Sequence, residues 1–348
     1  METYVIRAHG GPEVLARETR PLPEPGPGEA RVRVRAVALN HLDLWVRRGV
    51  PGHRFPLPLI PGSDGAGILT ALGPRTEVDG LGPGSQVLLA PGFGCGQCSA
   101  CLGGHESLCR HYRILGESRD GTCAHSILVP AGALLPLPAD LELEEAAALP
   151  LALMTTWQML MRRGRLQPGE TVLVHAGGSG IGSAAIQIAA AIGCRVLTTV
   201  GSTVKVRRAA ELGADEVILY QTTDLVAAVR SLTGKRGVDL VVEHTGAATW
   251  EASLRCLRRG GRLVTCGATT GADVQLNLRL LFYKQLELIG STMGSRADLA
   301  AALELVARGR LRPVVDRVFP IEALADAHRY LEERRAFGKI VLRGFAGD

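Results

Sequence analysis

Residues 171–193 read TVLVHAGGSGIGSAAIQIAAAIG, a strand-like apolar run, a glycine-rich turn and an alanine-rich helical segment in direct succession. Glycines let the backbone turn sharply and approach a pyrophosphate, and the N-terminus of the next helix offers N–H groups and a partial positive charge. In the G-x-G-x-x-G spacing, Gly177 and Gly182 take the outer positions, and Ser179 replaces the middle glycine. The stretch predicts a dinucleotide-binding turn formed by Gly177, Gly178, Ser179, Gly180, Ile181 and Gly182.

Strand-like and helix-like segments alternate after this turn. The runs CRVLTTV, EVILY and VDLVVEHTG are each followed by a helical pattern, and GRLVTCGA leads to a further strand near LELIGST. Alternation at this interval predicts right-handed βαβ units and a parallel sheet covered by helices on both faces. We therefore predict an α/β chain in which residues 146–292 form a doubly wound domain.

Residues 1–145 have a different character, with many glycines and prolines and short alternating runs such as RVRVRAV. These features indicate a β domain with many turns. Near the C-terminus, two helical stretches precede the strand-like run KIVL, which we expect to return to the first domain. The β domain would then comprise residues 1–145 and about 293–348, with a cleft between it and the inserted doubly wound domain.

A cluster of cysteines lies in the segment GCGQCSACLGGHESLC, and its members are Cys95, Cys98, Cys101 and Cys109. Four thiolates on a turn-rich loop can close a tetrahedral shell around Zn²⁺, which leaves no open position for a substrate. Two disulfides would require an oxidising compartment, and no basic-then-apolar leader follows Met1. An iron–sulfur cluster would favour a shorter last interval and a following proline. We predict a structural zinc, with empty or oxidised thiols as the alternative.

The composition narrows the class of protein. Apolar residues make up 46%, charged residues 21% and aromatic residues 4% of the chain, and the net charge is +5 without a basic tract. This composition argues against nucleic-acid binding, and no apolar run is long enough to cross a bilayer. We expect a cytoplasmic protein that acts on a small-molecule substrate.

The second strand of the doubly wound domain bears on the choice of dinucleotide. An acidic residue at the end of this strand would hold the ribose 2′-hydroxyl of NAD, but the chain reads TTVGSTVKVRR here. Gly201 removes that carboxylate, Ser202 offers a hydroxyl and Lys205 offers positive charge. NADP(H) is favoured and NAD(H) remains open, because the basic residues could also be the solvated face of the next helix.

Together these motifs resemble the medium-chain dehydrogenase/reductase superfamily over nearly the whole chain. The turn PGSDGAGIL, the cysteine segment, AGGSGIG and the closing FGKIVL all carry the resemblance. It implies a GroES-like β domain joined to a Rossmann domain, and a homodimer or homotetramer. It also implies cofactor contacts from Tyr220, which ends the third strand, and from Thr245.

The resemblance points to one loss. The family's zinc alcohol dehydrogenases hold a catalytic zinc with Cys, His and a third Cys or acid, and the corresponding positions here are Asn40, Ser63 and, with a looser alignment, Leu151. These residues cannot supply a thiolate and imidazole ligand set. Asp43 keeps its family position, and Asn40 with Asp43 matches the N-x-x-D pattern of the quinone oxidoreductase branch.

Without a catalytic metal, oxidation of a simple alcohol becomes hard, whereas quinones and conjugated carbonyls can still accept hydride. We therefore predict an NADPH-dependent reductase of such acceptors, with Asn40 orienting the acceptor, His41 or solvent delivering the proton, and Asp43 shaping the site. Two alternatives remain open. One is a zinc alcohol dehydrogenase with the ligands His41, Asp43 and Asp64, and the other is an inactive NADPH-binding protein that serves as a redox sensor or scaffold.

Overall fold

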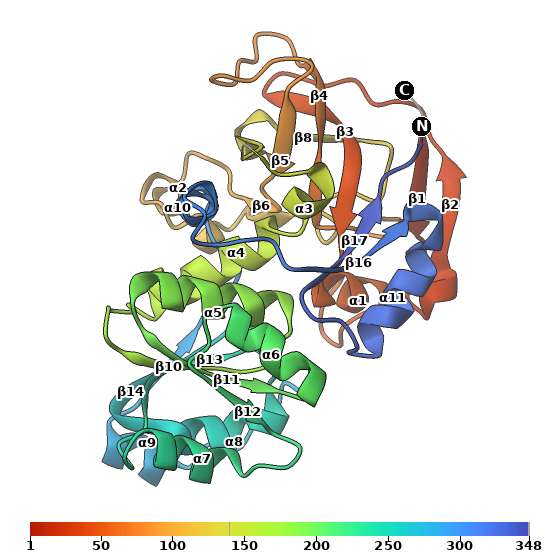
Figure 1. The fold of residues 1–348 in the computed structure, drawn as a ribbon. Helices are drawn as coiled ribbons and strands as arrows, with labels where there is room; N and C mark the ends of the chain where they lie inside the picture. Colours follow the sequence, from red (N-terminus) through yellow and green to blue (C-terminus); the bar gives the residue numbers. More distant parts are fainter. Residues whose placement is uncertain (139, 347–348) are drawn as a thin grey trace. The chain divides into compact units, whose positions relative to one another are not determined.

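The structure is a computed structural model that describes residues 1–138 and 140–346 (Figure 1). The chain divides into two compact units. The first comprises Met1–Leu151, Ser295–Leu303 and Pro313–Asp348, and the second comprises Ala152–Gly294 and Glu304–Arg312. The boundary predicted from the sequence, at 145/146, lies six residues before this one.

The first unit is built on a seven-stranded sheet. Its strands are β3 (Glu29–Ala38), β4 (Asp64–Leu72), β5 (Gln86–Leu89), β8 (Ser126–Pro130), β9 (Leu134–Pro136), β16 (Val315–Pro320) and β17 (Lys339–Arg343). The order is β16-β17-β3-β4-β5-β9, and β8 also pairs with β3. Because β17 pairs antiparallel with β3, the C-terminal part of the chain completes the N-terminal sheet.

Strand β3 shows why this segment forms a sheet. Val32, Val34 and Ala36 are buried, and the arginines between them point to the more accessible face. The alternation RVRVRAV therefore covers a core on one side only, as the period of a strand requires.

Smaller elements complete the first unit. Two two-stranded sheets are formed by β1 (Glu2–Ile6) with β2 (Leu15–Thr19) and by β6 (Gly92–Phe93) with β7 (Arg113–Ile114). The α-helices are α1 (His41–Arg48), α2 (Ser99–Leu102), α3 (Leu143–Ala147) and α11 (Leu324–Glu332). Short 3₁₀ turns occupy Pro12–Val14, Glu106–Leu108, Ala131–Ala133 and Ile321–Ala323. Two further helices, α4 (Pro150–Trp157) and α10 (Arg296–Ala307), run across unit boundaries.

The second unit holds a six-stranded sheet in which all neighbours are parallel. Its strands are β10 (Thr171–Val174), β11 (Arg195–Val200), β12 (Glu216–Leu219), β13 (Val238–Glu243), β14 (Leu257–Thr265) and β15 (Glu287–Gly290). The order β12-β11-β10-β13-β14-β15 is that of a doubly wound dinucleotide-binding sheet.

Helices cover both faces of this sheet. The helices are α5 (Gly180–Ile192), α6 (Thr203–Glu211), α7 (Leu225–Leu232), α8 (Ala247–Cys256) and α9 (Leu278–Lys284), and a π-helical turn spans Gln158–Arg163. Figure 1 shows α5 and α6 on one face and the other three helices on the opposite face. Every residue of β10 and β13 is buried, as expected for central strands of a parallel sheet.

The predicted fold class, an α/β chain with a GroES-like β domain and a Rossmann domain, is confirmed. Among the described residues, the helices are all too short or too polar to cross a lipid bilayer.

Candidate functional site

The glycine turn lies between β10 and α5, at the carboxyl edge of the parallel sheet, where the strand order reverses. Gly177 and Gly182 are sterically required there. A Cβ atom on Gly177 would lie 2.3 Å from the Thr198 hydroxyl oxygen, and one on Gly182 would lie 2.2 Å from the Ala176 carbonyl oxygen. The outer glycines therefore let two backbone segments approach closely, as a phosphate-binding turn demands.

Ser179 explains the departure from the middle glycine. It is the N-cap of α5, with extended backbone angles, and its hydroxyl oxygen accepts a hydrogen bond of 2.9 Å from the Gly182 N–H. Gly180 and Ile181 form the first turn of the helix, and Gly178 lies in the turn before it. The structure therefore brings all six predicted residues together at one helix N-terminus, where backbone N–H groups and the helix dipole favour an anion.

The segment after β11 carries the predicted contacts to the adenosine end of a dinucleotide. Gly201 directly follows the strand, and a Cβ atom there would lie 2.5 Å from the hydroxyl of the exposed Tyr220. Ser202 is the N-cap residue of α6, and Lys205 lies in the first turn of that helix. The next basic residue, Arg207, forms an exposed ion pair with Glu211 at 2.7 Å, as expected for a solvated helix face.

Thr245 follows β13 at the same sheet edge. Its N–H donates a hydrogen bond of 2.7 Å to a carboxylate oxygen of Glu243, and its carbonyl oxygen accepts one from the Thr270 hydroxyl. Glu243 and the neighbouring His175, both fully buried, were not singled out by the sequence analysis. The available signal was their position, since each stands at the end of a mostly apolar strand run.

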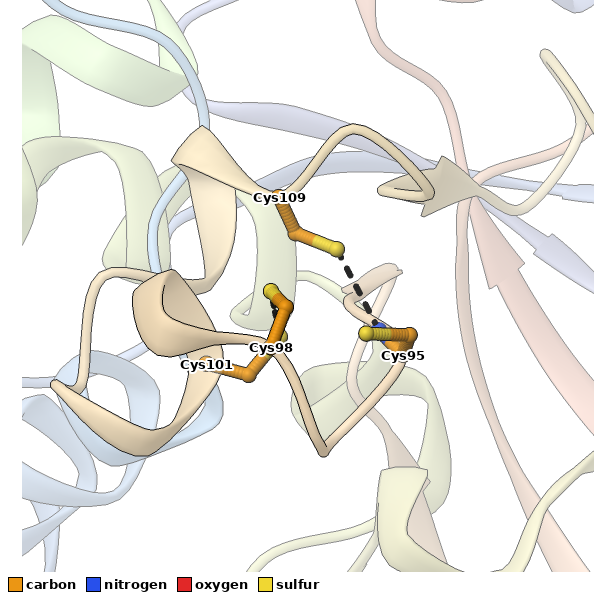
Figure 2. A group of neighbouring side chains, drawn as sticks. All are labelled: Cys95, Cys98, Cys101 and Cys109. Atoms are coloured by element: carbon orange, nitrogen blue, oxygen red, sulfur yellow. Dashed lines mark hydrogen bonds between the residues drawn. The ribbon is translucent and has the colours of Figure 1, made fainter.

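The four clustered cysteines lie around β6, α2 and the turn that follows, in the first unit. Their sulfur atoms all lie within 4.8 Å of one another and face a common centre (Figure 2). The sulfurs of Cys98 and Cys101 are 3.6 Å apart, close to the edge of roughly 3.8 Å of a tetrahedron whose metal–sulfur bonds are about 2.3 Å.

The backbone supports this cysteine cluster. The N–H groups of Cys95 and His111 donate to the sulfur of Cys109 at 3.5 and 3.3 Å, which stabilises a thiolate. A Cβ atom on Gly94 would lie 2.5 Å from the sulfur of Cys101, so a glycine is needed there. The structure pairs none of the eight cysteines in a disulfide. The donor set fits zinc.

A second polar cluster lies where α1, β4 and β17 meet in the first unit. Asn40 is the N-cap of α1, and its N–H donates to the Asp43 carboxylate at 2.7 Å. The Asn40 side-chain amide donates to Asp64 at 2.9 Å. The ammonium of Lys339 donates to the same Asp64 oxygen at 2.8 Å and also to the Asn40 amide oxygen.

These contacts fix the orientation of Asn40. An ammonium only donates hydrogen bonds and a carboxylate only accepts them, so the amide oxygen must face Lys339 and the amide nitrogen must face Asp64. The other Asp64 oxygen accepts the Leu151 N–H at 2.7 Å. Asp64 is 0% and Lys339 5% exposed, so this is a buried ion pair with hydrogen bonds on both carboxylate oxygens.

Asp43 is also buried and serves α1. It closes a capping box with Asn40, and its other oxygen accepts the Ser63 hydroxyl at 3.4 Å. Burial raises the pKa of Asp43 to about 6, although the Asn40 N–H and the Lys339 ammonium act in the opposite direction. Asp43 and Asp64 are therefore joined through hydrogen bonds from Asn40. His41, half-buried, is the first residue of α1 and directly follows Asn40.

Lys339 was missed by the sequence analysis as a site residue. Its only signal was its place in the FGKIVL run that carried the family resemblance.

Comparisons with known proteins agree with this architecture. The family model described as "Alcohol dehydrogenase GroES-like domain" matches residues 26–139, and the one described as "Zinc-binding dehydrogenase" matches residues 180–308. A quinone oxidoreductase of Pseudomonas aeruginosa is 35% identical over 347 residues, with 96% of this chain and 97% of that protein covered. An alcohol dehydrogenase of Schizosaccharomyces pombe is 30% identical over 340 residues, with 97% and 96% covered. A solved structure named as an NAD-dependent alcohol dehydrogenase is 49% identical, with a TM-score of 0.95 and 99% and 100% covered.

Proposed function

Because the chain belongs to the medium-chain dehydrogenase/reductase family and is an oxidoreductase of that family, we propose that it reduces quinones or activated carbonyls with NADPH. The proposal includes one structural zinc at the cysteine cluster and no catalytic zinc. The observation that carries this proposal is the buried ion pair of Lys339 with Asp64, in which the Asn40 side-chain amide hydrogen-bonds to both partners.

This ion pair argues against a catalytic metal in the polar cluster. Both oxygens of Asp64 already accept hydrogen bonds, and the charge of the carboxylate is balanced by an ammonium 2.8 Å away. A divalent cation brought to the same carboxylate would meet the repulsion of Lys339 in a medium of low dielectric constant. The neighbouring positions offer an amide and a hydroxyl, from Asn40 and Ser63, and these are poor ligands for zinc.

The polar cluster suits an acceptor that is activated by its own conjugation. A bound nicotinamide supplies a hydride, which is a proton with two electrons, and reduction is completed by one further proton at the acceptor oxygen. In this proposal the Asn40 amide, held rigidly by Lys339 and Asp64, orients the acceptor. His41 or solvent delivers the proton. Asp43, committed to the cap of α1, supports Asn40.

Two features support dinucleotide binding in the second unit. The glycine turn presents the N-terminus of α5, a helix of thirteen residues, and its outer glycines leave room for close backbone approach. The segment Gly201–Lys205 carries no carboxylate, and Ser202 and Lys205 are compatible with a 2′-phosphate. Because one solved relative is named as NAD-dependent, the preference for NADP(H) rests on this segment alone.

A charge exchange at Gly201 tests the choice of cofactor. Gly201→Asp places a carboxylate at the end of β11, and the added Cβ displaces only the exposed Tyr220 side chain. We expect kcat/KM for NADPH to fall by about tenfold or more relative to Gly201→Asn, the uncharged isostere, through like-charge repulsion with the 2′-phosphate. Equal values for the two variants would contradict an NADPH-specific segment.

Metal analysis combined with turnover tests the reaction class. We expect one zinc per chain and oxidation of NADPH with benzoquinone-type or enone acceptors. Two zincs per chain, with activity confined to primary alcohols, would instead establish the zinc alcohol dehydrogenase with His41, Asp43 and Asp64 as ligands. Tight NADPH binding without turnover on any acceptor would establish the inactive sensor or scaffold.

We also propose a homodimer or homotetramer. Five apolar side chains are well exposed on the segment before and within α9, namely Val274, Leu276, Leu278, Phe282 and Tyr283. The adjacent strand β15 is the last in the sheet order. A second copy of the chain can cover this apolar segment and extend the sheet edge, because both features occur on every copy.

A further inference from the structure

A path of hydrogen-bonded, buried polar groups leads from the end of β13 to the glycine turn, within the second unit. It starts at Glu243, the last residue of β13, which is 0% exposed. The Glu243 carboxylate accepts hydrogen bonds from the N–H groups of Thr245 and Gly246 at 2.7 and 3.1 Å and from the Ser253 hydroxyl at 2.7 Å. A buried carboxylate is therefore held by backbone dipoles and hydroxyls around the start of α8.

The path of polar groups continues through the imidazole of His175, which directly follows β10 and is 1% exposed. Its Nε2 lies 2.8 Å from the Ser253 hydroxyl oxygen, and its Nδ1 lies 3.4 Å from the Thr199 hydroxyl oxygen. The Thr199 hydroxyl oxygen in turn accepts the Ala176 N–H at 3.0 Å. One polar path therefore joins Glu243 to Ala176, the residue directly before the glycine turn.

The direction of each hydrogen bond follows from the groups at the two ends. The Ser253 hydroxyl contacts two oxygens that only accept, one of the Glu243 carboxylate at 2.7 Å and the Thr249 carbonyl at 2.8 Å, so its single proton is directed to them. Ser253 has no second hydroxyl proton, so Nε2 of His175 must donate to it. At the other end, Ala176 N–H donates to Thr199, whose hydroxyl proton is free to face Nδ1. His175 is thus the neutral tautomer with its proton on Nε2.

Burial supports this neutral form, because desolvation lowers the pKa of His175 to about 4. The charged and titratable groups that face the ring are Glu243, 3.7 Å from Nε2, and His244, whose Nε2 lies 2.9 Å from the His175 carbonyl oxygen. His244 is itself buried, and burial lowers its pKa as well.

The path ends at Ala176, a residue with a strained backbone conformation. Ala176 has a φ of +46°, which is uncommon for a residue with a side chain, and its carbonyl oxygen lies where a side chain of Gly182 would be. Its N–H is held by Thr199, and the next N–H, of Gly177, is held by the Thr199 carbonyl oxygen at 2.9 Å. The conformation of the turn therefore depends on where the Thr199 hydroxyl is held.

We propose that His175 is a positioning residue for the dinucleotide: with Ser253 and Thr199 it transmits the fixed position of Glu243 to Ala176 and so sets the shape of the phosphate-binding turn. This inference rests on the proposed function, since it requires that the turn binds a dinucleotide.

Two substitutions interrupt the path at different points. Thr199→Val removes the hydroxyl while keeping a side chain of similar shape, and His175→Gln removes the imidazole. For each we expect the Kd for NADPH, measured by titration of the whole protein, to rise about five- to tenfold, in line with the loss of one buried hydrogen bond. The value of kcat at saturating NADPH stays within about twofold, because the turn binds the cofactor and does not touch the reacting atoms.

A matched control is His328→Gln. His328 is another fully buried histidine, in the first unit, where its Nδ1 faces Arg47 at 3.3 Å. Its replacement lowers stability and leaves the Kd for NADPH unchanged.

Nitrogen NMR of the His175 ring gives a second readout, and we expect a protonated Nε2 and an unprotonated Nδ1 in the wild type. This signature changes in Thr199→Val, which a merely structural role for Thr199 would not require.

The outcomes separate the two proposals. A wild-type protein that binds neither NADPH nor NADH refutes the proposed function itself. If the wild type binds but both variants keep its Kd within about twofold, the positioning role is refuted and the function stands. If His175→Gln fails to fold, the near-isosteric Thr199→Val and the ring tautomer of the wild type still test the positioning role. A proton on Nδ1 of His175 in the wild type would refute this role.

Discussion

Replacing Lys339 by methionine tests the buried ion pair on which the proposed reaction class depends. Methionine keeps an unbranched apolar stem of similar length and removes only the ammonium. Asp64, fully buried, then loses its only described salt-bridge partner and keeps the hydrogen bonds from Asn40 and Leu151. Leaving a buried charge without its partner costs about 3–5 kcal/mol, and we expect the free energy of unfolding of Lys339→Met to fall by that amount.

A double-mutant cycle separates the loss of the pair from the loss of packing. Asp64→Asn removes the stranded charge, so the double variant should be destabilised by at least about 1 kcal/mol less than the sum of the two single variants. Arg329→Met is the matched control, because Arg329 and Asp326 form an ion pair in the same unit with side chains 53% and 68% exposed. An exposed pair of this kind is worth less than about 1 kcal/mol.

The assay is urea unfolding followed by tryptophan fluorescence. Of the three tryptophans in the sequence, only Trp45 belongs to the first unit, so Trp157 and Trp250 are replaced by phenylalanine in every variant. A loss for Lys339→Met no larger than that of Arg329→Met, or strict additivity in the cycle, would refute the reasoning. The acceptor site would then have no fixed internal cation.

Three further outcomes follow from the structure. Cys98→Ser should lower the zinc content from one to none per chain by elemental analysis, and retention of a full equivalent would argue against the four-thiolate site. The pKa of His175 is about 4 in the folded protein and about 6.5 in the unfolded chain, so the free energy of unfolding falls as the pH is lowered from 6.5 to 4. In His175→Gln this decrease, measured by urea unfolding, should be smaller by roughly 3 kcal/mol. An equal pH dependence of the free energy of unfolding in the wild type and in His175→Gln would contradict a buried neutral imidazole. Phe282→Asp should shift the mass measured by light scattering toward that of the monomer, whereas Val204→Asp, at an even more exposed apolar residue on α6, should leave it unchanged.

The doubly wound sheet could be predicted because its signals are local. Each strand-like run and the helix after it lie within about thirty residues, and the period changes from two to 3.6 at a visible glycine or proline. The same holds for the cysteine cluster, since four ligands within one loop must lie close in space. The role of Ser179 was less visible, because a helix cap and a substituted glycine look alike until the backbone angles are known.

The buried ion pair could not be predicted in the same way. Lys339 and Asp64 are 275 residues apart, and only the pairing of β17 with β3 brings the lysine to the start of α1. Local patterns treat a lysine at the start of a strand as a solvated residue, which is the commoner case. His175 and Glu243 are also distant in sequence, but both end a central strand of a parallel sheet, and this shared position was the available signal.

The buried carboxylates of Asp64 and Glu243 are stabilised in different ways, and the difference bears on the role proposed for each unit. Asp64 is neutralised by the ammonium of Lys339 at 2.8 Å, so the ion pair adds no net charge to the polar cluster where we propose that an uncharged quinone or enone binds. Glu243 is stabilised by backbone N–H groups and by hydroxyls, which add directed hydrogen bonds without adding positive charge. A cation beside Glu243 would add an attraction for phosphate that lacks direction. In our proposal the directed bonds instead fix the geometry of the turn, and the N–H groups of α5 recognise the phosphate.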